Sequence, residues 1–504
     1  MADGKRVAKN TVFLYIRMLV VMGVTLFTSR VYLQALGVDG YGVWNLVGGL
    51  AASFGFFTSS LSNATQRFLS VGHGRNDIEE VRSVFNASAY IYVIFGGTIL
   101  LIGMLLGPWL ISLLNIPPAL HTASYWVYYA TIVGLSVSIT ATMFDSVLIA
   151  RENMKIYAYL SVVEAFLKLA IAYLIMIAPS ATRLIVFALL SALVVILVKG
   201  AMIVYCARHY EEVHIKPHWD KPKVRSMIGF IGWNGIGTAV YALNDQSTSV
   251  LLNVFFGPVV NAARGVANQV NSAINTFSTN FFTAFTPQLI KTYAAGERAE
   301  FAKLFVSSNT LSFALLWFLF LPLILRRDYV LGLWLEEVPG YTSVFLVWIL
   351  LYSLVNSFTR PQWITVQAHG NLKPYMRWSI SFTLVGIACY YGILKLGMPP
   401  QSIFIVMVIV RAMFVMVSWR IVKRYVELST GQYLRRVYLP LAVLVCASFA
   451  IMYLIDPLIS QTFGGLVAVC LISLAVNGPL FFYAVLSRGE REKIVRTIKQ
   501  RFKR

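Results

Sequence analysis

Long apolar segments separated by short polar ones recur along the whole chain. An apolar run of about 20 residues is long enough to cross a bilayer as an α-helix. The pattern predicts about fourteen such spans, at residues 11–33, 41–65, 84–107, 122–149, 157–178, 182–206, 227–251, 260–285, 305–326, 342–368, 378–395, 402–422, 437–456 and 464–486. We therefore expect an all-α polytopic membrane protein.

The composition agrees with this prediction. Hydrophobic residues make up 58% of the chain and charged residues only 12%, and the mean hydropathy is +0.71. An ordinary soluble domain has about 25% charged residues. No small-residue cleavage site follows the first span, so we interpret it as an uncleaved anchor. The four cysteines lack metal-ligand spacing and are expected to be apolar helix residues.

Basic residues lie mainly on one side of the predicted membrane. The chain has 42 Lys and Arg against 21 Asp and Glu, a net charge of +21. With the N-terminus inside, 31 of the 42 basic residues fall in inside segments and four in outside loops. This asymmetry predicts that both termini are cytoplasmic. It also accounts for most of the net charge, so we expect no nucleic-acid partner.

The sequence contains a weak internal repeat with a spacing near 220 residues. The segment "YLQALGVDGYGVWN" after the first span aligns with "LLNVFFGPVVNAARG" after the seventh. Two six-span bundles in the same orientation are a common plan for transporters. The expected parts are a six-helix lobe at 1–206, a cytoplasmic linker at 207–226, a six-helix lobe at 227–425, helices 13 and 14 at 426–486, and a basic amphipathic cytoplasmic tail at 487–504. The tail is expected to lie on the inner leaflet, with a merely solvated tail as the alternative.

Polar side chains follow one face of the eighth span. Their intervals alternate between three and four residues, as on one side of a helix: Asn261, Arg264, Asn268, Asn271 and Asn275. Such a stripe is costly against lipid, so it should line a cavity or pack against another polar helix. Amides hydrogen-bond well to sugar hydroxyls and to phosphate. The structural alternative is that these amides join helices to each other.

Basic residues outnumber acids within the predicted spans. A guanidinium at membrane depth costs roughly 2.5–3.5 kcal/mol, so it needs a partner, a wet cavity or a route to the interface. Glu164 and Lys168 are four residues apart on one helix and are expected to neutralise each other. Six bases then remain against two acids, and this excess predicts a wet, cationic cavity suited to an anionic passenger. The six bases are Arg17, Arg30, Lys199, Arg264, Arg360 and Arg411, and the two acids are Asp145 and Asp245.

Some of these residues have alternative interpretations. Lys199 and Arg30 lie near span ends, where snorkelling to the interface would satisfy them. Arg360 precedes Pro361, where a helix is expected to kink. Asp245 and Asp145 are candidate carriers of H⁺ or Na⁺, because an acid at membrane depth is often functional. For Asp245 the alternative is an ion pair with a cavity arginine, and no other cofactor or metal is expected.

Enzyme signatures are missing from the sequence, which has no HExxH, P-loop or GxGxxG motif. The longest outside loop, "RRDYVLGLWLEEVPGYT", is typical of an interfacial segment with aromatic anchors. A membrane glycosyltransferase or polymerase would need catalytic carboxylates in a large outside loop. An ion-coupled drug exporter would fit the helical plan, but a cationic drug would favour an acidic cavity.

Several segments resemble bacterial polysaccharide flippases of the Wzx type. They are "NTVFLYIRMLVVMGVTLFTSRVYLQALGVDGYGVWNLVGG", "NATQRFLS" and "LIARENMKIYAYLSVVEAFLKL", and "LGLWLEEVPGYTSVFLVWILLYSLVNSF" is similar to the family's ninth-to-tenth connection. The superfamily also holds multidrug and toxic-compound extrusion transporters and the lipid II flippase. The resemblance covers nearly the whole chain and is most specific in the first 80 residues and in residues 145–170.

The resemblance implies two six-helix lobes that face each other across a V-shaped cavity. It implies that the chain moves undecaprenyl-pyrophosphate-linked oligosaccharide repeat units across the bacterial cytoplasmic membrane by alternating access. Such units supply surface polysaccharides such as O-antigen, so the polysaccharide polymerase machinery is an expected partner. Lipid II flippases use arginines in their first and eighth helices, and Arg17 and Arg264 lie in the matching helices here. On this interpretation they hold the pyrophosphate, Arg30, Arg360 and Arg411 add positive charge, and the asparagine stripe contacts sugars.

Overall fold

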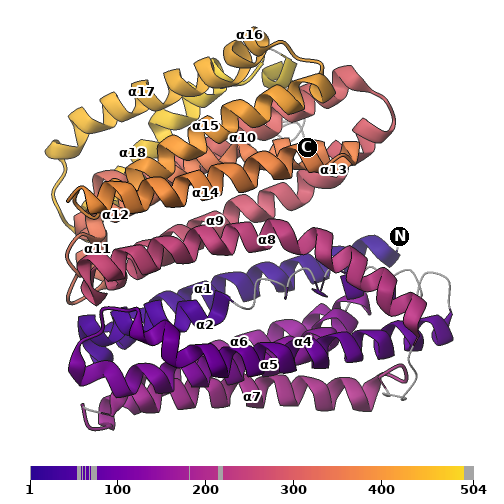
Figure 1. Ribbon diagram of the computed structural model, residues 1–504. Helices are drawn as coiled ribbons and strands as arrows, with labels where there is room; N and C mark the ends of the chain where they lie inside the picture. Colours follow the sequence, from indigo (N-terminus) through magenta and orange to yellow (C-terminus); the bar gives the residue numbers. More distant parts are fainter. Residues whose placement is uncertain are drawn as a thin grey trace. The chain divides into compact units, whose positions relative to one another are not determined.

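The chain folds into long helices joined by short turns, as Figure 1 shows for the computed structural model. The structure describes residues 2–53, 58, 61–62, 64–66, 68–69, 77–151, 153–180, 182–213, 220–487 and 489–492. Within these ranges only the backbone is described for residues 2–18, 52, 53 and 154 and for several positions within 221–241 and 277–294. The described residues contain no strand, and the all-α prediction is confirmed.

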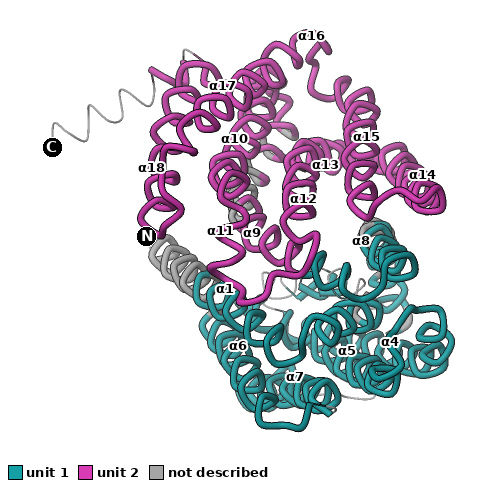
Figure 2. Tube along the Cα trace, turned by 90° about the vertical axis from the view of Figure 1, so that its left-hand side faces the viewer, with its two compact units in different colours: residues 1–265 teal, residues 266–504 magenta. Residues whose placement is uncertain are grey.

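The chain divides into two compact units, residues 1–265 and residues 266–504, coloured separately in Figure 2. The boundary falls inside helix α9 (Pro258–Ala294) and not in the segment 207–226 that was predicted as the linker. Packing therefore groups α8 (Lys221–Phe256) with the N-terminal unit. The predicted lobes at 1–206 and 227–425 rest on a sequence repeat and stay a prediction.

The first unit is built around α5, which packs closely against α4 and α7, while α1 packs against α6. Its aromatic core includes Phe85, Tyr92, Tyr128 and Phe187, all fully buried. The elements of this unit are α1 (Ala2–Val43), η1 (Trp44–Gly48), α2 (Gly49–Ser53), α4 (Ile78–Ser112), η3 (Pro118–Leu120), α5 (His121–Ala150), α6 (Met154–Ile177), α7 (Arg183–His209), α8 and the first turns of α9.

The second unit contains the remaining helices. They are the rest of α9, α10 (Arg298–Leu325), α11 (Arg327–Trp334), α12 (Thr342–Ser357), α13 (Thr359–His369), α14 (Lys373–Lys395), α15 (Ser402–Val426), α16 (Thr430–Tyr433), η4 (Leu434–Tyr438), α17 (Leu439–Ile455), η5 (Asp456–Leu458), α18 (Phe463–Leu480) and η6 (Phe481–Val485). The tenth predicted span is interrupted at Phe358, between α12 and α13, and Pro361 lies in the first turn of α13. The helix is thus interrupted where the sequence predicted a kink, and Pro361 lies in a first helical turn, where proline is tolerated.

Eleven helices among the described residues are long and apolar enough to cross a membrane. They match all the predicted spans except 41–65, 227–251 and 260–285. The first of these three lies partly outside the described residues, and the other two are α8 and α9, helices of 36 and 37 residues. The chain is therefore a multi-pass helical membrane protein. The count of fourteen and the cytoplasmic termini stay predictions, and most of the predicted tail, residues 493–504, lies outside the described residues.

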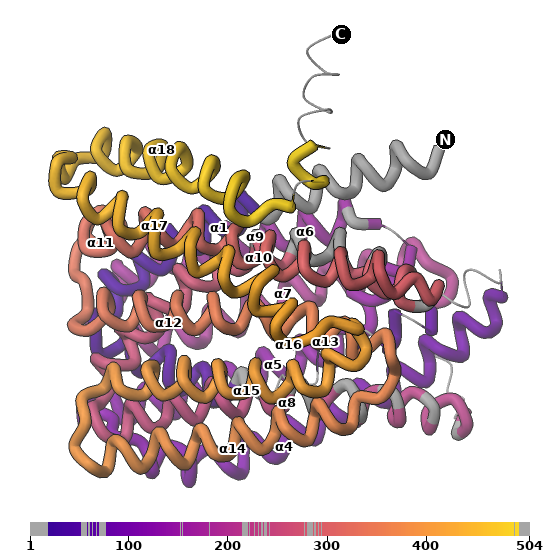
Figure 3. The backbone as a smooth tube through the Cα atoms, turned by 90° about the horizontal axis from the view of Figure 1, so that it is seen from above, coloured from indigo at the N-terminus to yellow at the C-terminus, as the bar shows by residue number. Residues whose placement is uncertain are grey.

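Helices α17 and α18 run side by side along the second unit (Figure 3), and polar contacts fasten them to it. Arg326, at the end of α10, is only 3% exposed, and its Nε lies 2.6 Å from Asp456 Oδ1. Its Nη2 also donates to the carbonyls of Asp456 and Ile459. Farther along, Trp317 donates to the Ser448 hydroxyl. These two helices are thus an integral part of the unit.

Replacing Arg326 with Met should lower the free energy of unfolding by about 3–5 kcal/mol, because Asp456 keeps a charge without its partner. Thermal unfolding of the purified protein in detergent measures the loss. Arg327→Met is the matched control, because Arg327 is 39% exposed and its nearest carboxylate, that of Asp328, is 3.7 Å away. Equal losses for the two variants would contradict the structural role of the buried pair.

The backbone at the two repeated loops supports the internal repeat. Gly37 ends the first long helix with φ 71° and ψ 173°, and Gly257 ends α8 with φ 83° and ψ −174°. Both glycines adopt the same extended conformation with positive φ, which side chains disfavour, at the 220-residue spacing of the sequence repeat. The two loops also meet within the first unit, where Gly42 lies directly against the Pro258 backbone.

Gly42→Ala should destabilise the first unit, because an added Cβ would lie 2.2 Å from the Pro258 carbonyl oxygen. We expect a loss of about 1–3 kcal/mol, the usual cost of overpacking. Gly23→Ala on the same helix is the control: nothing lies within 4 Å of its added Cβ, so the change should be neutral or stabilising. Thermal unfolding that gave the two variants the same stability would rule out the close approach.

Candidate functional site

All three acids at membrane depth form ion pairs. Lys168 Nζ lies 2.6 Å from Glu164 Oε1, which confirms the predicted local pair. Lys199 Nζ lies 2.7 Å from Asp145 Oδ2, and Arg264 Nη2 lies 2.5 Å from Asp245 Oδ1. Lys199 is thus held inside the protein, and Asp245 makes the ion pair that the sequence left as the alternative.

Basic residues at membrane depth outnumber acids. At this depth the predicted spans hold seven bases and three acids, so they carry four more bases than acids. The four arginines outside the three ion pairs above are Arg17, Arg30, Arg360 and Arg411. The excess of four equals the one expected from the sequence, where six bases and two acids remained after the Glu164–Lys168 pair.

The four arginines outside the three ion pairs lie in different surroundings. Arg17 belongs to α1, but its side chain lies outside the described residues, and Arg30, on the same helix, is half-buried. Arg360 Nη1 donates to Thr279 Oγ1 at 3.1 Å, which joins α13 to α9. The two arginines of the second unit, Arg360 and Arg411, are thus on different helices, α13 and α15.

Arg411 is surrounded by aromatic rings. Its Nη2 donates to the Tyr352 hydroxyl at 2.7 Å, and its guanidinium carbon lies 5.4 Å from the Tyr352 ring centre and 5.6 Å from that of Phe414. Cations over aromatic faces at such distances are attracted by the ring quadrupole. Among the described residues no carboxylate lies within ion-pair distance of Arg411. Its charge is therefore stabilised by polarisable groups and stays uncompensated.

The asparagine stripe of α9 is partly used for helix packing. Asn275 Nδ2 donates to Asn271 Oδ1 at 2.8 Å, and Ser353 Oγ on α12 donates to the same oxygen at 2.8 Å. Asn261 is 2% exposed and accepts a hydrogen bond from Ser249 Oγ on α8. Asn268 is half-buried. The contacts of Asn271 and Asn275 therefore match the structural alternative, in which the amides join helices to each other.

A pocket of about 260 Å³ lies inside the first unit, between α1, α5, α6 and α7. Both the Asp145–Lys199 and the Glu164–Lys168 pairs line it, together with the hydroxyl-bearing residues Thr25, Tyr157 and Ser161. A pocket of this size and polarity has room for several waters beside the four charges that line it.

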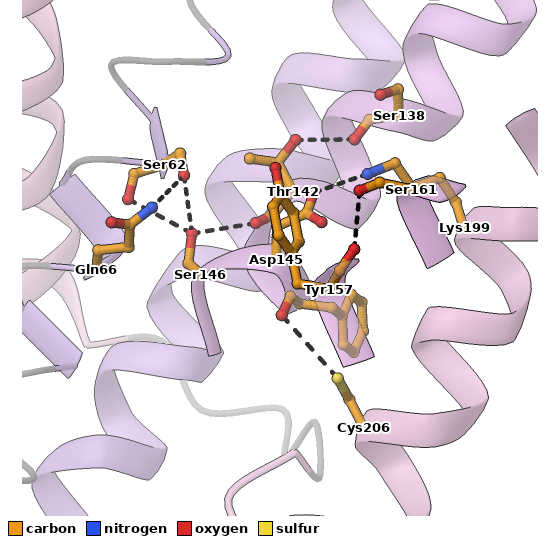
Figure 4. Close-up of polar contacts among 11 residues, drawn as sticks. Ser62, Gln66, Ser138, Thr142, Asp145, Ser146, Tyr157, Ser161, Lys199 and Cys206 are labelled. Carbon is orange, nitrogen blue, oxygen red and sulfur yellow. Dashed lines mark hydrogen bonds and ion pairs between the residues drawn. The ribbon is translucent and has the colours of Figure 1, made fainter. Parts of the chain in front are cut away.

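A chain of hydroxyl and amide groups continues from this pocket, as Figure 4 shows. Ser146, next in sequence to Asp145, lies 3.3 Å from the Ser62 hydroxyl, and Gln66 Nε2 donates to that hydroxyl at 2.8 Å. Ser146 also donates to the Thr142 carbonyl. Polar groups therefore extend on one side of Asp145 while Lys199 neutralises it on the other.

The segment "LIARENMKIYAYL" is held by contacts at the end of the unit predicted to face the cytoplasm. Arg151 makes two hydrogen bonds of 2.7 Å to Glu212, which is 1% exposed. The hydrogen bonds that it donates to the Glu212 carboxylate raise the pKa of the Arg151 guanidinium. Asn153 donates to the hydroxyls of Tyr205 and Tyr210. The described start of the predicted linker is thus fixed to this unit.

Comparison with known proteins agrees with this architecture. Residues 13–174 match the MatE family. No curated protein sequence matches the chain. Among solved structures, a multidrug resistance MATE family transporter of the MOP superfamily in an inward-facing conformation is 14% identical. It has a TM-score of 0.66, and the alignment covers 83% of this chain and 98% of that chain.

Two further structures widen the comparison. The lipid II flippase MurJ in an inward closed conformation is 12% identical with a TM-score of 0.72, over 94% of this chain and 98% of that chain. A MOP superfamily transporter from Pyrococcus furiosus, described as having a binding pocket of reverse polarity that suggests a different function, is 14% identical with a TM-score of 0.59, over 83% and 96%. The chain therefore has the MATE-like fold of MOP-superfamily transporters.

Asp145→Asn should destabilise the first unit by up to about 3–5 kcal/mol, because Lys199 keeps a largely buried charge without its partner. The double change Asp145→Asn with Lys199→Met should recover most of this loss, since no charge remains to be buried. Thermal unfolding in detergent compares the two variants. If the double variant is no more stable than the single one, the pair is not what holds these helices.

Proposed function

We propose that this chain is a flippase that moves undecaprenyl-pyrophosphate-linked oligosaccharide across the bacterial cytoplasmic membrane by alternating access. The observation that carries the proposal is the excess of bases over acids at membrane depth in the predicted spans, seven against three. Charge buried at this cost is retained where it serves a function. A passenger with a pyrophosphate group supplies the missing negative charge.

Guanidinium groups suit this passenger better than ammonium groups would. A planar guanidinium binds phosphate oxygens with two parallel hydrogen bonds and stays charged at any physiological pH. Five of the seven bases at membrane depth in the predicted spans are arginines, and both lysines there are paired with acids. We assign Arg17 and Arg264 to binding the pyrophosphate. Arg30, Arg360 and Arg411 would add to the positive field that attracts it.

The contacts refine the proposed role of the asparagines. Asn271 and Asn275 are hydrogen-bonded to each other and to Ser353, so they are less available to a sugar. We assign the sugar contacts to Asn268 and, when the site opens, to Asn261. The lipid tail would stay in the bilayer, and the polysaccharide polymerase machinery would receive the product.

Coupling to an ion is assigned to the pocket of the first unit. Asp145 lies there beside a row of hydroxyl groups, which can pass a proton along hydrogen bonds. It also forms an ion pair with Lys199. A proton or Na⁺ that takes the place of Lys199 on Asp145 would remove an ion pair between α5 and α7 and so could change how the two helices pack.

A multidrug exporter is the second candidate, and the match of residues 13–174 to the MatE family together with the MATE transporter structures favours it. The two candidates share the fold, so they differ in the charge of the passenger. A cationic drug would not balance the excess of bases over acids at membrane depth. For this reason the flippase is the preferred proposal.

Charge reversal tests the assignment in cells. Arg17→Glu or Arg264→Glu should abolish surface polysaccharide export in a deletion strain, whereas Arg327→Glu, outside the predicted spans, should leave export intact. Membrane levels of each variant, measured by immunoblot, control for folding. Full export with both Arg17 and Arg264 reversed would remove these roles. Sensitivity to cationic drugs with normal surface glycan would favour the exporter instead.

A further inference from the structure

Asp245 lies in front of Arg264 within the first unit. The side chain of Arg264 is 10% exposed and that of Asp245 is 44% exposed. Arg264 Nη2 donates both to Asp245 Oδ1, at 2.5 Å, and to the Asp245 carbonyl, at 2.9 Å. The described hydrogen bonds of this guanidinium therefore all go to one residue, and that residue is the more accessible of the two.

A second donor close to Arg264 is unused. Asn261 precedes Arg264 by three residues on α9, so the two lie on the same helix face. Its Oδ1 accepts from Ser249, but its Nδ2 is buried and has no hydrogen-bond partner among the described residues. A buried donor without an acceptor is costly. An acceptor with several oxygens placed at Arg264 would satisfy this amide as well.

We propose that Asp245 is a removable counter-ion of Arg264 that makes the site selective for anions of high charge. The proposal rests on the proposed function and deepens it, because it names the feature of the passenger that the site selects. A phosphate or pyrophosphate group replaces the Asp245 carboxylate on the guanidinium, and Asp245 turns to solvent. One ion pair is broken and one is formed, and no covalent bond changes.

Competition explains the selectivity. A carboxylate or another monoanion offers Arg264 no more than Asp245 already offers, and Asp245 is tethered beside it at a high effective concentration. Phosphate and, more strongly, pyrophosphate carry more charge and more acceptor oxygens than a carboxylate, so they gain by the exchange. In the empty protein the guanidinium is neutralised, which lowers the cost of holding it at membrane depth.

The surroundings of Asp245 leave Arg264 as its charged partner. Asp245 lies on α8, which packs against α2, η1 and α4 and is followed by the first turns of α9. Elements α2 and η1 have no charged residue, and neighbouring Gln246 is neutral. The Lys223–Glu80 pair joins α8 to α4 but lies 22 residues away, roughly 33 Å along the helix.

Binding of inorganic pyrophosphate to the purified full chain in detergent, measured by calorimetry at constant ionic strength, tests the exchange. Asp245→Asn should bind pyrophosphate about tenfold more tightly than the unaltered protein, and it should gain measurable affinity for acetate. Both gains should vanish in the double variant Asp245→Asn with Arg264→Gln, which keeps two hydrogen-bonding amides and no charge. Unchanged or weaker pyrophosphate binding by a folded Asp245→Asn variant would overturn the proposal.

Glu427→Gln is the control for net charge. It removes one negative charge from an exposed residue of the second unit, 3.7 Å from Arg298, and it should not change the affinity. A gain that appears with Glu427→Gln, or that persists without Arg264, would show a general charge effect and would contradict the exchange. Thermal unfolding of each variant verifies that the protein is folded.

The binding cycle and the export assay separate this proposal from the proposed function. If the exchange is seen but loss of the chain leaves polysaccharide intermediates unchanged, the counter-ion role stands and the passenger is another polyanion. If intermediates accumulate but Asp245→Asn binds pyrophosphate like the unaltered protein, the flippase stands and the counter-ion role is wrong.

Discussion

The cost of burying a guanidinium in the membrane is the constraint on which this structure depends. Three of the seven bases at membrane depth satisfy it with the three acids there, through Lys168, Lys199 and Arg264. At this depth the predicted spans hold four more bases than acids. Around Arg411, aromatic rings lower the cost of the buried charge. The remaining positive charge suits an anionic passenger and gives the flippase proposal its physical basis.

Features that depend on local sequence could be predicted. Apolar runs of about 20 residues predict helices because length and hydropathy are properties of a segment. The Glu164–Lys168 pair follows from a spacing of four residues, and the break before Pro361 follows from the missing amide of proline. The 220-residue repeat likewise predicted equivalent loops, and Gly37 and Gly257 share one backbone conformation.

Features that depend on long-range packing could not be predicted. Asp145 and Lys199 are 54 residues apart, and Arg326 and Asp456 are 130 apart, so no spacing rule links them. The sequence therefore treated Lys199 as a candidate for snorkelling and placed Arg326 in an outside loop. The asparagine stripe was visible, but the Ser353 partner on α12 that holds Asn271 was not. The boundary inside α9 also reflects packing and leaves no mark in composition.

The fold does not distinguish the two candidate functions, whereas the charge at membrane depth bears on the choice between them. The MATE-like fold is shared by a multidrug transporter and by the lipid II flippase MurJ, at 14% and 12% identity. Function on a shared fold is decided by the site. In this chain the predicted spans hold more bases than acids. The preference for a lipid-linked phosphate over a cationic drug rests on the negative charge of the phosphate.

The most direct measurement is the leaflet location of lipid-linked oligosaccharides in a strain that lacks this chain. Extraction of the intermediates, combined with a membrane-impermeant probe of their sugars, locates them on either face. The account predicts complete repeat units trapped on the cytoplasmic face. Complete units already exposed on the outer face, or intermediates identical to those of the parent strain, would contradict it.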